Sequence, residues 1–261
     1  MTKYSMYFST FKNYYYLLTL LVKKDIKKKY KGSFLGILWS LFNPLLNMIV
    51  LTIVFSTVFK HNISHYPVYL LCGNLLFSFF SLSTTASMKS VINSAGLIKK
   101  IYVPKYMFTL APIISNFVFF IISLLVLIIL IIATKAPITI YILYSPVYLL
   151  LLLAFSCGVS LILATITVFF RDIEHIYGVL ITALLYASAI FYPENIIPDR
   201  FRYIITFNPM YHFIKGFRHA VYEGVPIDLY NLLICCILAT ISLIIGAKVF
   251  EKCQDKFILY I

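Results

Sequence analysis

Charged side chains are scarce in this sequence, and long stretches contain none. Only 12% of the 261 residues are Asp, Glu, Lys or Arg, whereas soluble domains usually have about 25%. Hydrophobic residues make up 62%, which excludes an ordinary soluble domain. Because the charge-free runs reach the length of about 20 residues that a membrane helix needs, we expect an all-α, polytopic membrane protein.

Several chemical signatures are also missing from the sequence. It has no G-x-x-x-x-G-K-[ST] segment for ATP and no C-x-x-C pair among its five cysteines. His61 and His65 are four residues apart, but the glutamate of an H-E-x-x-H zinc site is missing. We therefore predict no catalytic residue, no metal site and no cofactor in this chain. The predicted spans hold no charged residue, which argues against a proton- or sodium-coupled carrier.

The segment Lys23–Pro44 passes abruptly from a basic surface to an apolar run. It reads K-K-D-I-K-K-K-Y-K-G-S-F-L-G-I-L-W-S-L-F-N-P, and seven of its first nine residues are charged. Within residues 14–31, apolar residues such as Leu18 and Leu21 recur at helical spacing opposite the lysines. This pattern predicts an amphipathic helix in the lipid headgroup layer. A solvated basic tail is the alternative.

Charge-free runs predict six membrane spans, and the basic residues predict their orientation. With the N-terminus inside, 16 Lys and Arg residues lie on the inner side and 6 on the outer side, so we expect both termini in the cytoplasm. The expected regions are an N-terminal segment (1–33), a membrane domain (34–250) and a C-terminal tail (251–261). The predicted spans are 34–59, 66–88, 106–134, the part of 136–170 after Pro146, 176–192 and 229–247.

Two connections are more than simple turns. The inner connection, 89–105, carries apolar residues on a basic loop, which predicts an exposed docking knob for a soluble partner. An interfacial helix without a partner is the alternative. The outer connection, 194–225, is too polar to span and too apolar for a free loop. We expect two short re-entrant helices there, at about 198–206 and 210–222.

Aromatic side chains dominate the chemistry of the predicted spans. The sequence has 21 Tyr and 23 Phe against one Trp. Most serve packing and interface belts, and some could line a path for sugar rings, whose C–H faces stack on aromatic faces. Ordinary packing is the alternative for each candidate. The candidates for such a pathway are Trp39, Phe42, Tyr186, Phe191 and Tyr192.

Four separated motifs, in order, resemble one transporter family. The basic-to-apolar segment quoted above, the loop N-S-A-G-L-I-K-K-I-Y-V-P, and the series F-F-R-D-I-E-H, A-I-F-Y-P and F-N-P-M-Y resemble type-2 ABC transporter permeases that export polysaccharide and teichoic acid. The resemblance covers nearly the whole chain. It implies a homodimer in the bacterial cytoplasmic membrane, with two copies of a separate P-loop ATPase that binds ATP and Mg. It also implies a polymer substrate on an undecaprenyl-diphosphate-type lipid and no nucleic-acid partner.

The resemblance also implies roles for particular residues. The lipid diphosphate is expected to meet a lysine cluster, comprising Lys24, Lys27, Lys28, Lys29 and Lys31. The expected ATPase-coupling residues are Leu97, Ile98, Lys99, Lys100, Ile101 and Tyr102, and at a second contact Arg171, Asp172 and Glu174. A helix-capping turn is the alternative for this second contact.

Two other functions are weighed against this reading. One is a type-2 ABC exporter for a small lipid or a drug, which co-purified glycan would distinguish. The other is a membrane-bound acyl- or glycosyltransferase, which would need convergent polar residues at one interface. The sequence suggests no such set, so we expect a transporter subunit that is not itself an enzyme.

Overall fold

The computed structural model describes residues 3–58, 63–100 and 103–261, and these ranges contain helices and no strand. The all-α prediction is confirmed. The long helices are α1 (Lys3–Lys29), α2 (Trp39–Val58), α3 (Tyr66–Met88), α6 (Tyr106–Thr134), α7 (Ser145–Phe169) and α11 (Leu229–Cys253). The shorter helices are α4 (Ser90–Asn93), α5 (Ala95–Ile98), α8 (Ile173–Tyr186), α9 (Arg202–Thr206) and α10 (Pro209–Arg218). Short turns of tighter or wider helix are η1 (Gly36–Leu38), η2 (Ile140–Tyr144), η3 (Glu194–Ile196), η4 (Asp199–Phe201), η5 (His219–Glu223) and η6 (Gln254–Leu259).

Five helical segments of the described chain are long and apolar enough to cross a membrane. Two of them, α3 and α6, have the bounds that the sequence predicts. The predicted fifth span, 176–192, is wrong in its bounds, because α8 begins at Ile173 and ends at Tyr186. Its 14 residues rise about 21 Å, which is short of a hydrocarbon core roughly 30 Å thick.

Arg218 explains why the chain leaves the helix after α8. Its Nη1 and Nη2 groups donate to the carbonyls of Ala189 and Ile190, at 2.8 and 3.0 Å, and its Nε group donates to the carbonyl of Tyr69 at 3.3 Å. Ala189 has a φ of 48°, a left-handed conformation that ends a helix. Arg218 lies at the end of α10, within the short helix expected at about 210–222, and its side chain is buried.

Two tyrosines of α3 donate hydrogen bonds to the other carbonyls of the irregular segment after α8. The Tyr66 hydroxyl donates to the carbonyl of Phe191 at 2.9 Å, and the Tyr69 hydroxyl is 2.9 Å from the carbonyl of Tyr192. Irregular backbone at membrane depth is tolerated only where protein or water satisfies it. Side chains of α3 and α10 therefore replace the hydrogen bonds that a longer α8 would have made.

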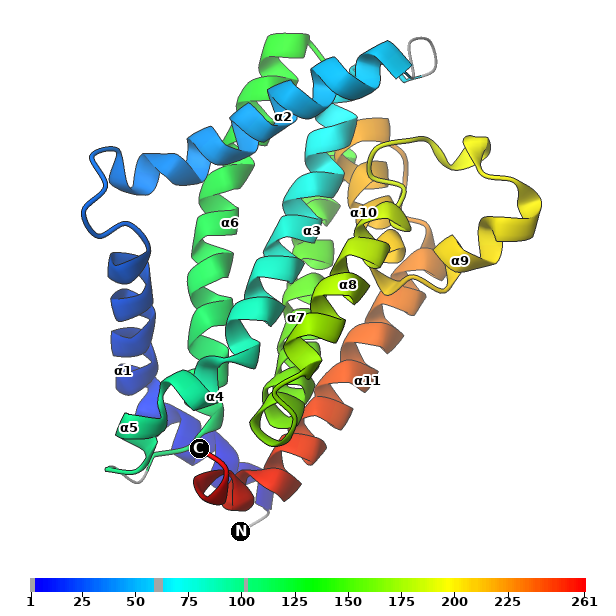
Figure 1. The fold of residues 1–261 in the computed structure, drawn as a ribbon. Helices are drawn as coiled ribbons and strands as arrows, with labels where there is room; N and C mark the ends of the chain where they lie inside the picture. Colours follow the sequence, from blue (N-terminus) through cyan, green and yellow to red (C-terminus); the bar gives the residue numbers. More distant parts are fainter. Residues whose placement is uncertain (1–2, 59–62, 101–102) are drawn as a thin grey trace.

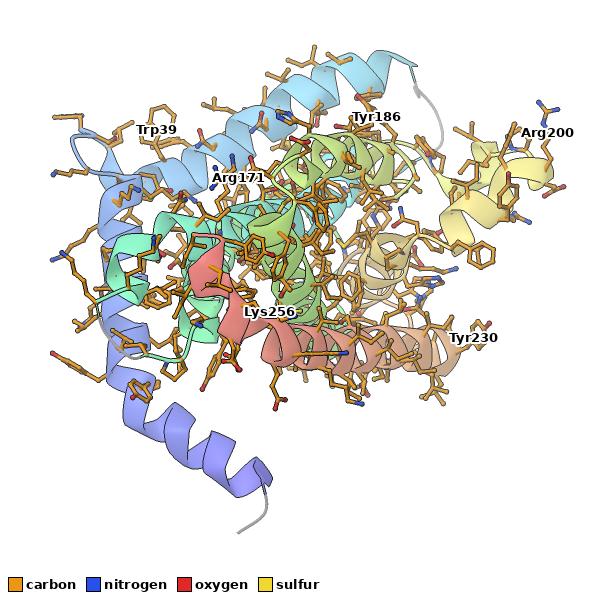
Figure 2. All side chains as sticks on the ribbon, turned by 60° about the horizontal axis from the view of Figure 1, so that its bottom comes forward. Trp39, Arg171, Tyr186, Arg200, Tyr230 and Lys256 are labelled. Carbon is orange, nitrogen blue, oxygen red and sulfur yellow. The ribbon has the colours of Figure 1, made fainter. Side chains whose placement is uncertain are left out.

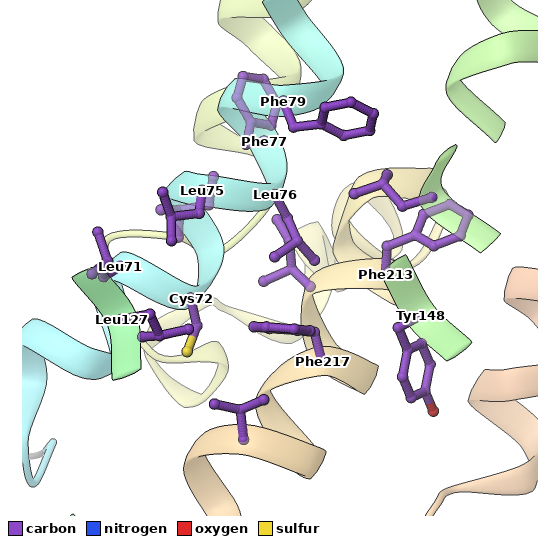
Figure 3. Packing of buried hydrophobic residues seen from close by; sticks show 14 of the residues in the cluster. Leu71, Cys72, Leu75, Leu76, Phe77, Phe79, Leu127, Tyr148, Phe213 and Phe217 are labelled. Carbon is purple, nitrogen blue, oxygen red and sulfur yellow. The ribbon is translucent and has the colours of Figure 1, made fainter. Parts of the chain in front are cut away.

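The core is built around α3, which packs against α6, α7 and α10. Figure 3 shows the leucine and phenylalanine side chains of α3 meeting Phe213 and Phe217 of α10 and Tyr148 of α7. Gly216 faces the Tyr148 ring so closely that any added Cβ would overlap it. The short helix α10 is thus part of the central core.

Helices α7 and α11 touch through their backbones. A Cβ added to Gly158 would overlap the backbone of Ser242 and Leu243, and one added to Gly246 would overlap the Gly158 carbonyl. Small residues permit such close crossings of membrane helices, where van der Waals contact drives association. The pair therefore packs closely along an extensive contact.

The end of the bundle that holds η6 has its own apolar cluster. Leu18 and Leu21 of α1 are buried with Met107 and Phe108 of α6. Phe257 of η6 is also fully buried there. The first turns of α1 and the C-terminal η6 consequently lie at the same end of the molecule (Figure 1).

Helix α2 packs against α6 and α3 but is the least buried of the five long apolar segments described. It passes obliquely across α6 toward the start of α3 (Figure 1), and Ile49, Val50, Ile53 and Val54 on it are exposed. The Ser123 hydroxyl of α6 donates to the Ser40 carbonyl at 2.8 Å and ties the first turn of α2 to the bundle. The space between α1, α2, α3 and α6 holds the candidate site.

Candidate functional site

The first part of the site, the lysine cavity, lies between α1, the end of α3 and α6. Its volume is about 330 Å³, and four lysines contribute to its lining. Lys24, Lys28 and Lys29 come from α1, and Lys89 directly follows α3. Asp25 is the one carboxylate among the described residues that line it. The cavity thus offers an excess of positive charge.

The second part, the amide cavity, lies farther along α2, α3 and α6, with a volume of about 340 Å³. Its polar lining includes four asparagines: Asn43 and Asn47 from α2, Asn74 from α3 and Asn116 from α6. Asn43 and Asn47 are four residues apart and share one helix face. Three serines and five aromatic rings complete the polar and ring-bearing lining, namely Ser40, Ser78, Ser123, Tyr30, Trp39, Phe79, Phe119 and Phe120.

The two cavities meet at Lys29, Asn116 and Phe119, which line both. The Lys29 Nζ atom lies 4.1 Å from the centroid of the Phe119 ring, and the Tyr30 ring meets the same ring edge-on at 5.3 Å. Burial lowers the pKa of Lys29 from its ordinary value. Lys29 therefore stands at the junction of the two parts, with its ammonium group against the Phe119 ring.

Charge and burial also act on Asp25 in the lysine cavity. Burial raises the pKa of Asp25, while the nearby ammonium groups of Lys24 and Lys28 oppose that shift. The Asp25 carboxylate offsets only part of the lysine charge, because four lysines line the same cavity. The lysine cavity can therefore hold an anion.

The chemistry of the two parts differs in a way that suits a ligand with two ends. Ammonium groups attract phosphate oxygens, and Lys commonly binds phosphate as a point charge. Asparagine amides donate and accept hydrogen bonds at once, as sugar hydroxyls do. Rings such as Trp39 offer apolar faces. The site can hold an anionic group at one end and a polyhydroxylated group at the other.

Comparison with known proteins identifies the family. The family model described as ABC-2 type transporter matches residues 16–222. The chain belongs to the ABC-2 type transporter family. The predicted resemblance to type-2 ABC permeases is thereby confirmed.

The curated relatives of this ABC-2 chain carry related names. The O-antigen export system permease protein RfbA of Klebsiella pneumoniae is 31% identical over 242 residues, which cover 92% of this chain and 93% of that protein. A protein of the same name from Myxococcus xanthus is 29% identical and covers 76% of this chain and 77% of its own length. The polysialic acid transport protein KpsM of Escherichia coli is 25% identical over 41% of this chain and 42% of its own length.

In this ABC-2 chain, the predicted lysine cluster divides into two sets. Lys24, Lys28 and Lys29 line the lysine cavity. Lys27 and Lys31 are exposed and lie outside the described lining of either cavity. The role of all five in binding a lipid diphosphate stays a prediction, and the geometry favours the first set.

The predicted aromatic pathway also falls into two groups. Trp39 lines the amide cavity at the start of α2, and Phe42 meets it edge-on at 6.4 Å. The other three gather beyond the end of α8, where Phe191 lies 6.0 Å from the Tyr186 ring and the Tyr192 hydroxyl donates to the Tyr186 carbonyl. Figure 2 shows Trp39 beside the α1–α2 connection and Tyr186 on α8. Only Trp39 among them lines a described cavity.

The predicted ATPase-coupling residues are partly exposed. Leu97, Lys99 and Lys100 face solvent. Ile98 was expected on the exposed knob, but it is buried, because α5 turns that side chain into the inner apolar cluster. The remaining members of the knob, Ile101 and Tyr102, lie outside the described residues, as does His61 of the weighed histidine pair.

The second predicted contact is the connection between α7 and α8. Arg171 and Asp172 are exposed there, and Figure 2 labels Arg171 near the start of α8. Glu174 instead forms an ion pair with Lys89, at 2.5 Å. This connection is therefore tied to a residue that also lines the lysine cavity.

Sequence reasoning missed the asparagines and Lys89. Asn43 and Asn47 carry a usable signal, since two amides four residues apart in a charge-free run mark a polar face. Asn74 and Asn116 carry none by themselves, because only the packing of α3 and α6 brings them beside α2. The partners of Lys89 are likewise set by tertiary structure.

Proposed function

We propose that this chain is the membrane subunit of an ATP-driven exporter of lipid-linked cell-surface polysaccharide. Membership of the ABC-2 type transporter family and relatives named for export of O-antigen and transport of polysialic acid support this function. The chain carries the substrate path and leaves ATP and Mg to a separate subunit, since its sequence has no P-loop.

One observation carries the proposal: the lysine cavity and the amide cavity meet at Lys29. A lipid-linked glycan has a diphosphate next to its first sugar. The lysine cavity suits the diphosphate, and the amide cavity suits the sugar hydroxyls, with Trp39 as a stacking surface. A diphosphate of the undecaprenyl type would place its lipid tail outward, toward the bilayer beside α1 and α2.

The proposed membrane arrangement has six crossings with both termini in the cytoplasm. Five crossings are the long apolar helices. The other is α8 together with the irregular segment 187–193, in which Arg218 and tyrosines of α3 bind the carbonyls of residues 189–192. The helices α9 and α10 re-enter from the outer side, and α1 lies along the inner interface.

The proposed assembly is a homodimer with two copies of a P-loop ATPase. The exposed apolar side chains of α2 and α8, such as Ile53 and Val179, fit a face shared by two copies and the lipid. The exposed Leu97, Lys99 and Lys100 fit the ATPase contact. Arg171 and Asp172 fit its second part.

The test is a pull-down of the full chain from its native membrane in mild detergent. We expect one co-purifying P-loop ATPase near equal stoichiometry and polyprenyl-linked glycan by mass spectrometry. ATPase with a small lipid or drug and no glycan would favour the other type of ABC exporter. A folded preparation without any ATPase would contradict the proposal.

A further inference from the structure

Lys89 belongs to two sites at once. Its side chain lines the lysine cavity, and its Nζ atom lies 2.5 Å from the Oε2 atom of Glu174. Glu174 stands in the first turn of α8. Lys89 thus lines the cavity in which an anion would bind and also pairs with a carboxylate in the first turn of α8.

This ion pair is easily exchanged. The Lys89 side chain is 50% exposed and the Glu174 side chain 26% exposed, and pairs of this kind add little stability in water. A ligand that offers two or more negative charges at the cavity can therefore compete with the single carboxylate of Glu174.

The charges that face Lys89 favour that competition. Lys24, Lys28 and Lys29 approach from α1, and Asp25 is the one described carboxylate lining the same cavity. A diphosphate would neutralise several ammonium groups together, whereas Glu174 reaches only Lys89. By pairing with Lys89, Glu174 offsets part of the positive charge of the cavity.

The start of α8 has few other attachments to α3. The Tyr177 hydroxyl donates to the Thr84 hydroxyl at 2.6 Å, and Tyr177 packs with Met88 and Leu163 in a small buried cluster. The exposed residues before Ile173 carry none of that packing. Release of Glu174 would remove the ion pair that joins the start of α8 to Lys89, while Ile173 and Tyr177 still hold the helix through the buried cluster.

We propose that an anionic diphosphate headgroup in the lysine cavity takes Lys89 from Glu174 and so releases the connection between α7 and α8. This inference rests on the proposed function and adds a loading signal to it. The released segment includes Arg171 and Asp172, so a filled cavity changes the surface offered at the second cytoplasmic contact.

Zero-length cross-linking tests the exchange directly. A carbodiimide joins a carboxylate to an amine only where the two are in contact, and mass spectrometry measures the yield of the Lys89–Glu174 link. The full chain is held in phosphatidylcholine nanodiscs, and the probe is undecaprenyl diphosphate. The outer pair of Lys215 and Glu194, 3.8 Å apart, is the internal control.

We expect the probe to lower the Lys89–Glu174 yield at least about threefold, the range of a weak surface pair, and to leave the control link unchanged. Inorganic pyrophosphate and phosphatidylglycerol separate the sources of the anion. A loss of the link with pyrophosphate alone assigns the site to the diphosphate group itself. An equal loss with phosphatidylglycerol would overturn the assignment, because any anionic lipid would then suffice.

Binding measured on variants provides a second readout. Trp39 is the one tryptophan of the chain and lines the amide cavity, so its fluorescence reports probe binding. Glu174→Gln should tighten binding about threefold, and Lys89→Gln should weaken it about fivefold. Asp172→Asn removes the same charge from the same connection and should leave the affinity unchanged.

The outcomes separate this inference from the proposed function. Probe binding with an unchanged Lys89–Glu174 link overturns the exchange and leaves the exporter intact. Equal effects of Glu174→Gln and Asp172→Asn would also overturn it, because general electrostatics would then explain both. Absence of probe binding in the wild-type chain contradicts both proposals at the level of the site.

Discussion

The guanidinium carbon of Arg218 lies 3.5 Å from the centroid of the Tyr69 ring. The same guanidinium donates to the carbonyls of Ala189 and Ile190. One side chain therefore joins α3, α10 and the segment that follows α8. The planar geometry of arginine suits this combination of stacking and multiple donation, which lysine cannot reproduce.

Arg218→Lys should destabilise the packing of α3, α10 and the segment that follows α8. At least two charged hydrogen bonds are lost, each worth about 1.5–3 kcal/mol, so the thermal unfolding midpoint of the purified chain should fall by several degrees. Arg200→Lys is the control, because Arg200 is exposed and lies over one neighbouring ring, that of Phe201. Equal midpoints for the two variants would show that Arg218 has no clamping role.

The lysines that line the cavity should matter more than their neighbours. Lys24, Lys28 and Lys29 changed together to Gln should weaken binding of undecaprenyl diphosphate by about tenfold or more, since each basic group near a membrane surface contributes roughly 1 kcal/mol. Tryptophan fluorescence of the chain in nanodiscs measures this.

The matched control removes the same charge from exposed positions of the same segment. Lys23, Lys27 and Lys31 lie outside the described cavity linings, and their triple change to Gln should cost less than about threefold in affinity. Similar losses in both triple variants would mean that the lysines act through total charge or membrane orientation.

Substitutions at Leu97 and Ile98 should distinguish a loss of docking to the ATPase from a loss of stability. Leu97→Ala alters an exposed side chain, so we expect normal stability and a loss of the ATPase stimulation that the partner subunit shows in the complex. Ile98→Ala removes a buried side chain and should cost about 2–5 kcal/mol of stability. Thermal unfolding and ATPase assays on both variants check this, and normal stimulation with Leu97→Ala would contradict the docking role.

Gly158→Ala should force α7 away from α11. The added methyl overlaps the backbone of Ser242 and Leu243, and overpacking of this kind costs about 1–3 kcal/mol. Gly178→Ala is the matched control, since open space surrounds Gly178 and alanine is the better helix residue. A lower unfolding midpoint for Gly158→Ala alone is expected. If both variants unfold alike, the backbone contact is not needed.

The sequence predicts the ends of a helix correctly where charged residues flank its apolar run. Helix α6 lies between Lys105 and Lys135, and both its bounds follow from the sequence. The end of α8 could not be predicted in this way, because no charge or breaker stands between Tyr186 and Pro193. There the helix ends where distant donors on α3 and α10 bind the carbonyls.

The part of the site that could be predicted consists of residues that lie close together in the sequence. Lys24, Lys28 and Lys29 lie in one basic run, so their clustering is local. The asparagines of the amide cavity come from α2, α3 and α6, and the Lys89–Glu174 pair joins residues 85 positions apart. Such groupings depend on packing, which a single sequence shows only through local periodicity.

The contact between Gly158 and Gly246 has a mechanical consequence. Because the two backbones touch, neither a lipid chain nor a side chain can slip between α7 and α11, and neither helix can roll against the other. We expect α7 and α11 to move together as one rigid unit. If the proposed transport path widens, we expect the displacement at α2 and α8, whose faces carry exposed apolar side chains, and not at the contact between α7 and α11.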